Sequence, residues 1–263
     1  MKTGILLTAF GTRVPEARAV LGSVASPVRE HFPDRVVRWA YTSGVVRRKL
    51  AEEGTFIDSP EAALARFAEE GFERIDLWSL HVIPGKEFHD LARTARGFHR
   101  AKHGLPEIRL TRPLLSSYED LRRVVQCLLE GLPAERNPEE EAVLFMGHGS
   151  AHHPADLIYA AMNFALGEED ENVFVATTQG FPSLSQILPR LDRGRLRKVH
   201  LLPFMLTPGE HIRTDMAGDH PESWKSILEH RGLECSISLK GLAENPGVME
   251  IWLDHLRNAQ PLG

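Results

Sequence analysis

The sequence predicts an α/β protein made of two similar lobes, and three observations lead to this prediction. Short apolar runs alternate with longer helical patterns along the chain, which is the signature of strand–helix–strand units on a parallel sheet. The landmarks of the first half recur in the same order in the second half. The 263 residues also exceed one typical domain, whose length is roughly 100 to 200 residues. We therefore expect two Rossmann-like lobes, each with a four-stranded parallel sheet flanked by helices.

The first lobe shows the alternation most clearly. Strands are predicted over residues 4–10, 36–44 and 74–83, and helices over residues 15–32, 59–71 and 117–132. The start of the second helix supports the assignment, because Ser59 is a capping residue, Pro60 suits the first turn and Glu61 places an acid there.

The second lobe repeats this plan, with strands predicted over residues 141–150, 172–180, 198–206 and 234–242. "ILLTAFGT" at 5–12 matches "VLFMGHGS" at 143–150, "AYTSG" at 40–44 matches "ATTQG" at 176–180, and "PGKE" at 84–87 matches "PGEH" at 208–211. "LLSSYEDL" at 114–121 matches "LAENPGVM" at 242–249. The acidic, proline-bearing stretch 132–142 is the best linker candidate. We predict an N-terminal lobe over 1–135 and a C-terminal lobe over 136–263, with a cleft between them.

Composition excludes several classes of protein. Hydrophobic residues at 42% and charged residues at 25% are typical of a compact globular chain. The net charge of −5 argues against a nucleic-acid-binding protein. Cys127 and Cys235 have no CxxC partner, so neither a disulfide framework nor a thiolate zinc site is indicated. No apolar segment approaches membrane-spanning length. The sequence therefore predicts a cytoplasmic protein.

Two loop tips in the second lobe carry imidazoles that the first lobe lacks. In the overlay of the two copies, Phe10 corresponds to His148 and Glu87 corresponds to His211. Ligands bind at the carboxyl ends of parallel strands, and imidazole both coordinates divalent metals and accepts protons near neutral pH. Glu87 offers an oxygen ligand or a proton acceptor from the other lobe. We predict that His148, His211 and Glu87 form an open divalent-metal site.

Other polar residues near these tips have weaker signals. We interpret His152 and His153 as surface or helix-start residues. His81 stands at a strand end, where a structural hydrogen-bonded role and a functional role remain equally open. Gly147 and Gly149 alone are a weak phosphate signal. Ser150 lacks the GxSxG context of a hydrolase nucleophile.

The order and number of motifs resemble a known family, the class II chelatases that insert a divalent metal into a tetrapyrrole. Within that family the chain is similar to the anaerobic sirohydrochlorin cobaltochelatases of the CbiK type. The resemblance runs the length of the chain and rests on "FGT" at 10–12, "TSG" at 42–44, "SLH" at 79–81, "GKE" at 85–87, "PLLSS" at 113–117, "FMGHG" at 145–149, "GEH" at 209–211, "DMAGD" at 215–219 and "GLAENP" at 241–246.

The resemblance implies which residues carry the chemistry. The essential histidine of the family corresponds to His148, its second histidine to His211 and its cleft glutamate to Glu87. Related enzymes often place a metal-binding glutamate where this chain has Gln179. A neutral amide oxygen should be a weaker ligand than a carboxylate, and either Glu87 or Glu210 is expected to compensate.

The resemblance also implies an activity. We expect a sirohydrochlorin cobaltochelatase that inserts Co²⁺ in anaerobic cobalamin biosynthesis, with the metal as substrate and no prosthetic group. His148 and His211 would hold the ion and remove the pyrrole protons, assisted by Glu87. Predicted contacts to the tetrapyrrole are Phe10, Thr12, Arg13, Ser43, His81 and Ser150. Two alternatives remain open, namely Fe²⁺ insertion to make sirohaem, and a non-catalytic two-lobed ligand- or metal-binding protein. Association into a homo-oligomer is also left open.

Overall fold

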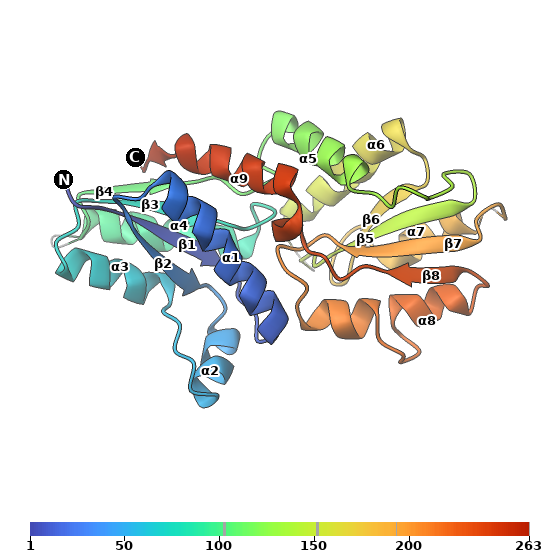
Figure 1. The fold of residues 1–263 in the computed structure, drawn as a ribbon, viewed down its shortest axis with the longest axis horizontal. Helices are drawn as coiled ribbons and strands as arrows, with labels where there is room; N and C mark the ends of the chain where they lie inside the picture. The colour runs from blue at the N-terminus through green and yellow to red at the C-terminus, as the bar shows by residue number, and fades with distance from the viewer. Residues whose placement is uncertain (102–103, 151–152, 193, 263) are drawn as a thin grey trace. The chain divides into compact units, whose positions relative to one another are not determined.

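A computed structural model describes residues 1–101, 104–150, 153–192 and 194–262. The chain forms two compact units, one of Met1–Ser116 with Glu250–Gly263 and one of Ser117–Met249. Each unit is built on one sheet that is flanked by helices (Figure 1). The predicted α/β class is confirmed. Within the described residues, none of the helices has the length and apolar character needed to cross a membrane.

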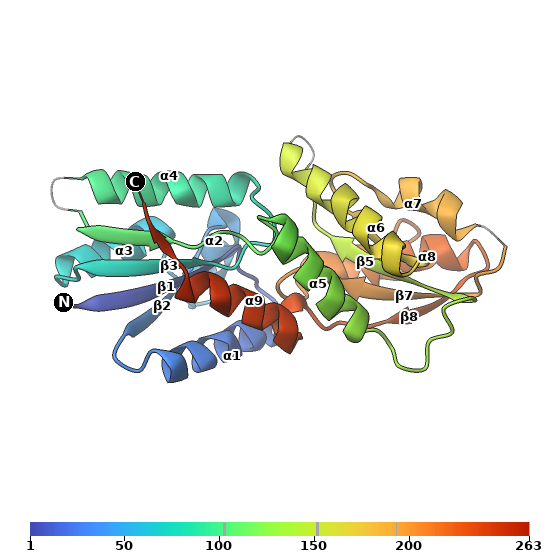
Figure 2. The same cartoon turned by 90° about the horizontal axis from the view of Figure 1, so that it is seen from above.

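The first unit contains a five-stranded sheet in the order β2-β1-β3-β4-β9. Its strands are β1 (Thr3–Ala9), β2 (Val36–Tyr41), β3 (Arg74–Ser79), β4 (Glu107–Leu110) and β9 (Gln260–Pro261), and its helices are α1 (Pro15–His31), α2 (Gly44–Glu52), α3 (Pro60–Glu69), α4 (Lys86–Arg100) and the end of α9 (Pro246–Arg257). Strands β1 to β4 are parallel, and β9 adds an antiparallel fifth at the edge of β4. Figure 2 shows the chain returning from α9 to this edge.

The fifth strand corrects the prediction of four strands in the first lobe. It consists of two exposed residues, one of them a proline, and so it has no periodic apolar pattern that could reveal a strand. The central strands were predictable for the opposite reason. All residues of β1 after Thr3 are buried, as expected for a parallel strand covered by helices on both faces.

Helices cover the two faces of the first sheet by different contacts. On one face, Leu77 of β3 packs in a core with Phe67 of α3 and Leu91 of α4. Side chains alternate along a strand, so the neighbouring Trp78 points to the other face. There the Trp78 indole Nε1 donates a hydrogen bond of 2.9 Å to the carbonyl of Trp252 in α9. The C-terminal helix therefore belongs structurally to the first sheet.

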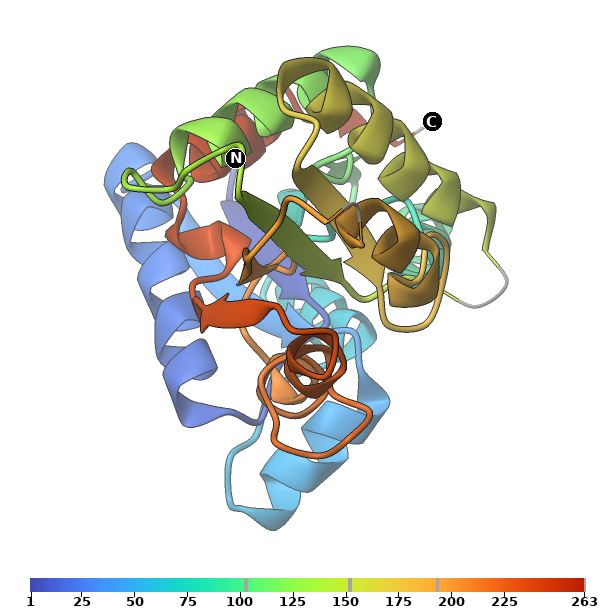
Figure 3. The same cartoon turned by 90° about the vertical axis from the view of Figure 1, so that its right-hand side faces the viewer.

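The second unit contains a four-stranded parallel sheet in the order β6-β5-β7-β8. Its strands are β5 (Glu141–Gly147), β6 (Val173–Thr177), β7 (Lys198–Pro203) and β8 (Glu234–Ile237), and its helices and turns are α5 (Tyr118–Glu130), η1 (Pro154–Asp156), α6 (Leu157–Glu169), α7 (Leu184–Leu191), η2 (Ile212–Met216), α8 (Trp224–Glu229) and η3 (Leu242–Glu244). Figure 3 shows α5 and α6 on one side of these strands and α8 on the other.

The two sheets share one topology, as the sequence repeat predicts. In each, the first strand of the copy is central, the second lies at one edge and the fourth lies beyond the third. The paired strands β1 and β5 begin at residues 3 and 141, which are 138 positions apart. This offset is the one that relates "ILLTAFGT" to "VLFMGHGS".

The helices after the last strands do not follow the repeat. Helix α5 comes after β4 of the first sheet, yet it packs in the second unit, where Arg122 pairs with Glu169 of α6 at 3.4 Å. Conversely, α9 comes after β8 of the second sheet, and its part from Glu250 onward packs in the first unit. The compact units therefore divide the chain after Ser116 and after Met249, whereas the sequence predicts one boundary near residue 135.

The side chain of Asn163 in α6 pairs with the main chain of β6, the edge strand of the second sheet. Replacing it tests how much these hydrogen bonds stabilise the protein. Its Oδ1 accepts a hydrogen bond of 2.8 Å from the Val175 amide, and its Nδ2 donates one of 2.6 Å to the Val175 carbonyl. Val175 is fully buried in the edge strand β6. Asn163→Ala should lower the free energy of unfolding by about 2–4 kcal/mol, because it leaves two buried main-chain groups unpaired.

Urea unfolding of the variant measures this loss. Asn258→Ala is the matched control, because the Asn258 side chain donates an exposed hydrogen bond of 2.8 Å to the Asp254 carbonyl. We expect the control to lie within about 0.5 kcal/mol of the wild-type protein. Equal unfolding midpoints for the two variants would contradict the assigned role of Asn163.

Candidate functional site

The turn after β5 requires its two glycines. A Cβ atom on Gly147 would lie 2.7 Å from the Cε1 atom of Tyr159. Gly149 has a φ of +72°, and a Cβ there would lie 2.7 Å from the Cβ of Thr177. Side chains are strained at such a φ and have no space at such distances. The GHG sequence therefore lets the main chain pass between two packed side chains while it presents His148.

His148 is held at both its main chain and its ring. Its carbonyl accepts hydrogen bonds from the Gln179 amide at 3.0 Å and from the Thr178 hydroxyl at 2.9 Å. Its ring Nδ1 lies 2.8 Å from the carbonyl oxygen of Gly149. A carbonyl oxygen only accepts, so Nδ1 must carry the proton. In the neutral ring, Nε2 then keeps its lone pair for a metal ion or a proton.

His211 shows the same arrangement with a stronger acceptor. It stands at the start of η2, a π-helical turn, and π-helical turns are frequent at functional sites. Its Nδ1 lies 2.6 Å from a carboxylate oxygen of Asp215, whose other oxygen accepts a hydrogen bond of 2.8 Å from Thr214. Partial burial tends to raise the pKa of Asp215, but the hydrogen bonds from His211 and Thr214 outweigh it and hold the pKa below its usual value. A carboxylate behind an imidazole is the usual support of a metal-binding histidine.

The two histidines lie side by side. Their ring centres are 5.1 Å apart and their planes meet at 78°. Two imidazoles that share one tetrahedral ion through nitrogens at about 2.1 Å have ring centres roughly 5 Å apart. The spacing is therefore suited to a shared ion. The side chain of His211 is 43% exposed, so a ligand can approach the pair from solvent.

The pair is not completed by further metal ligands in the described part of the chain. No group of three or more His, Cys, Asp or Glu side chains there could hold a metal ion. Gln179, a metal ligand predicted from the sequence, is exposed, and its main-chain N–H donates a hydrogen bond to the His148 carbonyl. Ser150 is half-buried, and its amide donates a hydrogen bond of 2.9 Å to Asp156. His153 accepts a hydrogen bond from the Ala155 amide at the start of η1, which confirms its helix-start role. His152 lies outside the described residues.

The remaining predicted site residues lie in the first unit, at the carboxyl ends of β1, β2 and β3. Phe10 follows β1 and is 49% exposed. Glu87 is half-buried in the first turn of α4. His81 follows β3, where its Nδ1 lies 2.9 Å from the Ser79 hydroxyl, and its Nε2 is buried without a hydrogen-bond partner among the described residues. Burial lowers the pKa of His81 to about 4, so this ring is neutral at physiological pH.

Three predicted tetrapyrrole contacts use their polar groups locally. Thr12 is buried, and its hydroxyl accepts a hydrogen bond of 3.2 Å from the Val14 amide. Ser43 caps α2 by accepting a hydrogen bond of 3.3 Å from the Val46 amide. Arg13 pairs with Glu53 at 2.9 Å. Of these three residues, Arg13 has the most exposed side chain, at 41%.

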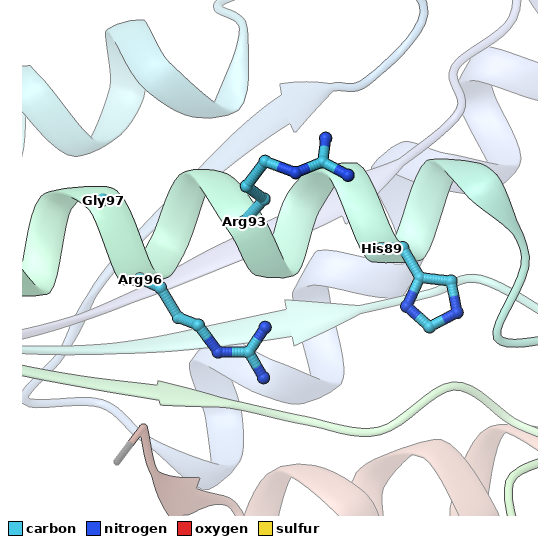
Figure 4. A pocket seen from close by; sticks show the side chains of 4 residues that line it. All are labelled: His89, Arg93, Arg96 and Gly97. Carbon is cyan, nitrogen blue, oxygen red and sulfur yellow. The ribbon is translucent and has the colours of Figure 1, made fainter.

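A hollow of about 490 Å³ lies along α4. It is lined by His89, Arg93, Arg96 and Gly97 (Figure 4). Arg93 is paired with Asp90 of the same helix at 2.6 Å. No residue of the predicted site lines this hollow.

Asp215 joins the candidate site through its hydrogen bond to His211, and it is not among the residues predicted from the sequence. It follows His211 by four positions in "HIRTD", a spacing that places two side chains on the same face of a helical turn. That spacing could have identified it. The segment 207–213 reads as a loop after a strand, and so the helical turn that joins the two side chains was not expected.

Comparisons with known proteins show the fold and the family of the chain. The solved structure of SirB from Bacillus subtilis with Fe³⁺ has a TM-score of 0.64 at 16% identity, and the match covers 98% of this chain and 95% of that chain. The two proteins therefore share a fold. A family model described as cobalt chelatase (CbiK) matches residues 3–260, and the chain belongs to this family.

Two curated relatives match nearly the whole chain. The sirohydrochlorin cobaltochelatase CbiKC of Nitratidesulfovibrio vulgaris (strain Hildenborough) is 42% identical over 258 residues, which cover 98% of this chain and 90% of that protein. The sirohydrochlorin cobaltochelatase of Salmonella typhimurium is 31% identical over 261 residues, which cover 98% and 97%.

The contact between His211 and Asp215 predicts a fixed tautomer. The wild-type protein should show His211 with its proton on Nδ1 in long-range ¹H–¹⁵N correlation spectra at pH 8. Asp215→Ala removes the acceptor, so the Nε2–H form should become populated. Asp219→Ala is the control, because Asp219 is exposed and pairs with Lys225 at 2.6 Å. An unchanged His211 tautomer in Asp215→Ala would show that the carboxylate does not fix the ring.

Proposed function

We propose that this protein is a sirohydrochlorin cobaltochelatase, which inserts Co²⁺ into a sirohydrochlorin-type tetrapyrrole in anaerobic cobalamin biosynthesis. Membership of the cobalt chelatase family and two full-length relatives of that name support the proposal. The observation that carries it is the pair of neighbouring imidazoles, His148 and His211, whose Nδ1 atoms are both occupied. This arrangement leaves two lone pairs for one incoming ion.

A two-histidine site suits a metal that must be passed on. Structural metal sites in proteins have four protein ligands, and such sites hold their ion tightly. Here the described residues supply two neighbouring imidazoles and no cluster of three ligands. The ion therefore keeps water in its other positions, and the pyrrole nitrogens of the substrate can replace that water one position at a time.

The same two imidazoles balance the protons of the reaction. Metallation releases two protons from the pyrrole nitrogens. Each Nε2 lone pair holds either the metal or a proton. As the ion moves to the macrocycle, both Nε2 atoms are freed and can accept one proton each. The Asp215 carboxylate stabilises the positive charge that then forms on His211.

The remaining residues of this proposal come from both units. Glu87 assists as a proton acceptor or an oxygen ligand, and Glu210 is the alternative carboxylate. The carboxylates of the tetrapyrrole bind Arg13 and the hydroxyl groups of Thr12, Ser43 and Ser150. Phe10 contacts the ring, and His81 provides a neutral hydrogen-bonding group. Gln179 is a weak oxygen ligand.

Loss of either imidazole should abolish most of the activity. We expect His148→Ala and His211→Ala each to lower kcat for Co²⁺ insertion by about 100- to 10,000-fold, because a ligand and a proton acceptor are lost together. The assay follows the absorbance change of anaerobic sirohydrochlorin with Co²⁺. His230→Ala is the control, because the His230 ring is bonded to the Ser226 carbonyl at 2.7 Å in another part of the unit. Wild-type activity in folded His148→Ala would place the centre elsewhere.

The identity of the metal can be tested in the same assay. Nitrogen ligands bind Co²⁺ more tightly than Fe²⁺, so we expect Co²⁺ at equal concentration to be inserted at least as fast as Fe²⁺. Insertion of Fe²⁺ alone would identify a sirohaem-forming ferrochelatase instead. Binding of sirohydrochlorin without acceleration by either metal would identify a non-catalytic binding protein.

A further inference from the structure

Asp156 is a buried carboxylate that the proposed chemistry does not use. It stands at the start of α6, and 6% of its surface is exposed. Its main chain is already helical, and the residue that caps this helical segment is His153, whose side chain accepts a hydrogen bond from the Ala155 amide. The Asp156 side chain forms no capping bond. One carboxylate oxygen, Oδ2, instead accepts a hydrogen bond of 2.9 Å from the amide of Ser150.

The other oxygen of Asp156 is left without a partner. Oδ1 is buried and has no hydrogen-bond partner among the described residues. A buried acceptor without a partner is destabilising. Such a group calls for an explanation other than local stability, and the hydrogen bond to its Oδ2 comes from the loop that carries His148.

The carboxylate of Asp156 occupies space that any side chain at position 180 would fill. A Cβ atom on Gly180 would lie 2.1 Å from Asp156 Oδ2 and 2.9 Å from the Ser150 nitrogen. Gly180 belongs to the loop after β6 that also binds the His148 carbonyl through Thr178 and Gln179. Glycine at position 180 therefore allows the carboxylate to reach the Ser150 amide between two loops.

We infer that Asp156 is a positioning residue for metal insertion, which holds the Gly147–Ser150 loop so that His148 meets His211. This inference rests on the proposed function. The loop is fixed from the β6 side by the two bonds to the His148 carbonyl and from the α6 side by Asp156. Asp156 touches neither imidazole ring in any hydrogen bond of the structure and acts through the main chain of Ser150.

Three variants distinguish the effect of losing the hydrogen bond to Ser150 from the effect of losing the negative charge. A fourth variant controls for general loss of stability. Asp156→Ala removes the acceptor. Asp156→Asn keeps a carbonyl oxygen that can bind the Ser150 amide, but it removes the charge. Gly180→Ala leaves Asp156 in place and displaces its carboxylate through the added Cβ. Gly167→Ala is the matched control, because a Cβ there would meet only the end of the Arg190 side chain, at 3.8 Å.

The kinetic readout is Co²⁺ insertion into sirohydrochlorin. For Asp156→Ala and Gly180→Ala we expect kcat to fall about 10- to 100-fold, because small displacements of a reacting group have effects of this size. These kcat values are measured at saturating sirohydrochlorin, because Ser150, which Asp156 holds, is itself among the proposed contacts to the tetrapyrrole. Asp156→Asn should retain at least about one third of the wild-type kcat, and Gly167→Ala should match the wild type.

Two further measurements do not depend on activity. Hydrogen exchange of the Ser150 amide should be slow in the wild type and in Asp156→Asn, and fast in Asp156→Ala. Titration with Co²⁺ alone should show about tenfold weaker binding in Asp156→Ala, because the two imidazoles no longer keep a fixed separation. If the wild-type protein inserts no cobalt, the proposed function fails, while these two measurements still test the role of Asp156.

The inference is overturned by either of two results. Wild-type kcat and wild-type Ser150 exchange in Asp156→Ala would show that the carboxylate does not hold the loop. Equal loss of activity in Asp156→Asn and Asp156→Ala, with slow Ser150 exchange in the asparagine variant, would show that charge matters and position does not.

Discussion

The proposed chemistry depends on the ring protons of His148 and His211, which hydrogen bonds keep on Nδ1. Each of the neighbouring histidines donates a hydrogen bond from Nδ1–H to a fixed acceptor. The acceptor is a main-chain carbonyl for His148 and the Asp215 carboxylate for His211. Without these acceptors each neutral ring could carry its proton on Nε2, the nitrogen that must bind the metal. The acceptors are also unequal. An anionic acceptor stabilises a metal-bound or protonated ring more than a neutral carbonyl does, so the two imidazoles are chemically distinct members of one pair.

The fold supplies these acceptors at little distance from the sheet. His148 stands one residue after β5, and the acceptor for its ring is the next residue along the chain. His211 and Asp215 share one short helical turn after β7. Because β5 and β7 are adjacent parallel strands, their carboxyl ends lie at the same edge of the sheet. Two histidines that are distant in the sequence therefore meet without any long side-chain reach.

Much of this arrangement could be predicted from the sequence. Buried parallel strands such as β1 and β5 appear as apolar runs, and the 138-residue offset between them shows the repeat. The overlay of the copies singled out His148 and His211, because a polar substitution at a strand end is visible without coordinates. Asp215 and Asp156 were not singled out. Their roles depend on the direction of a side chain from a turn, and residue type alone does not fix that direction.

The sequence repeat also could not show which sheet is covered by α5 and which by α9, the helices that follow the last strand of each copy. A repeat reports the order of elements along the chain, whereas packing is decided by the surfaces that meet. The short strand β9 was missed for a related reason, because its two residues gain their conformation only by pairing with β4. Local patterns thus predicted the elements, and contacts between distant segments decided their grouping.

The packing of α5 in the second unit and of α9 in the first has a consequence for how the chain folds during synthesis. The first sheet is synthesised early, but Trp78 finds its partner in α9 and β4 finds its partner in β9, both of which come after residue 245. During synthesis on a ribosome, one face of the first sheet therefore stays incompletely covered until the residues after 245 have emerged. The first unit is completed only after the strands of the second unit have been made.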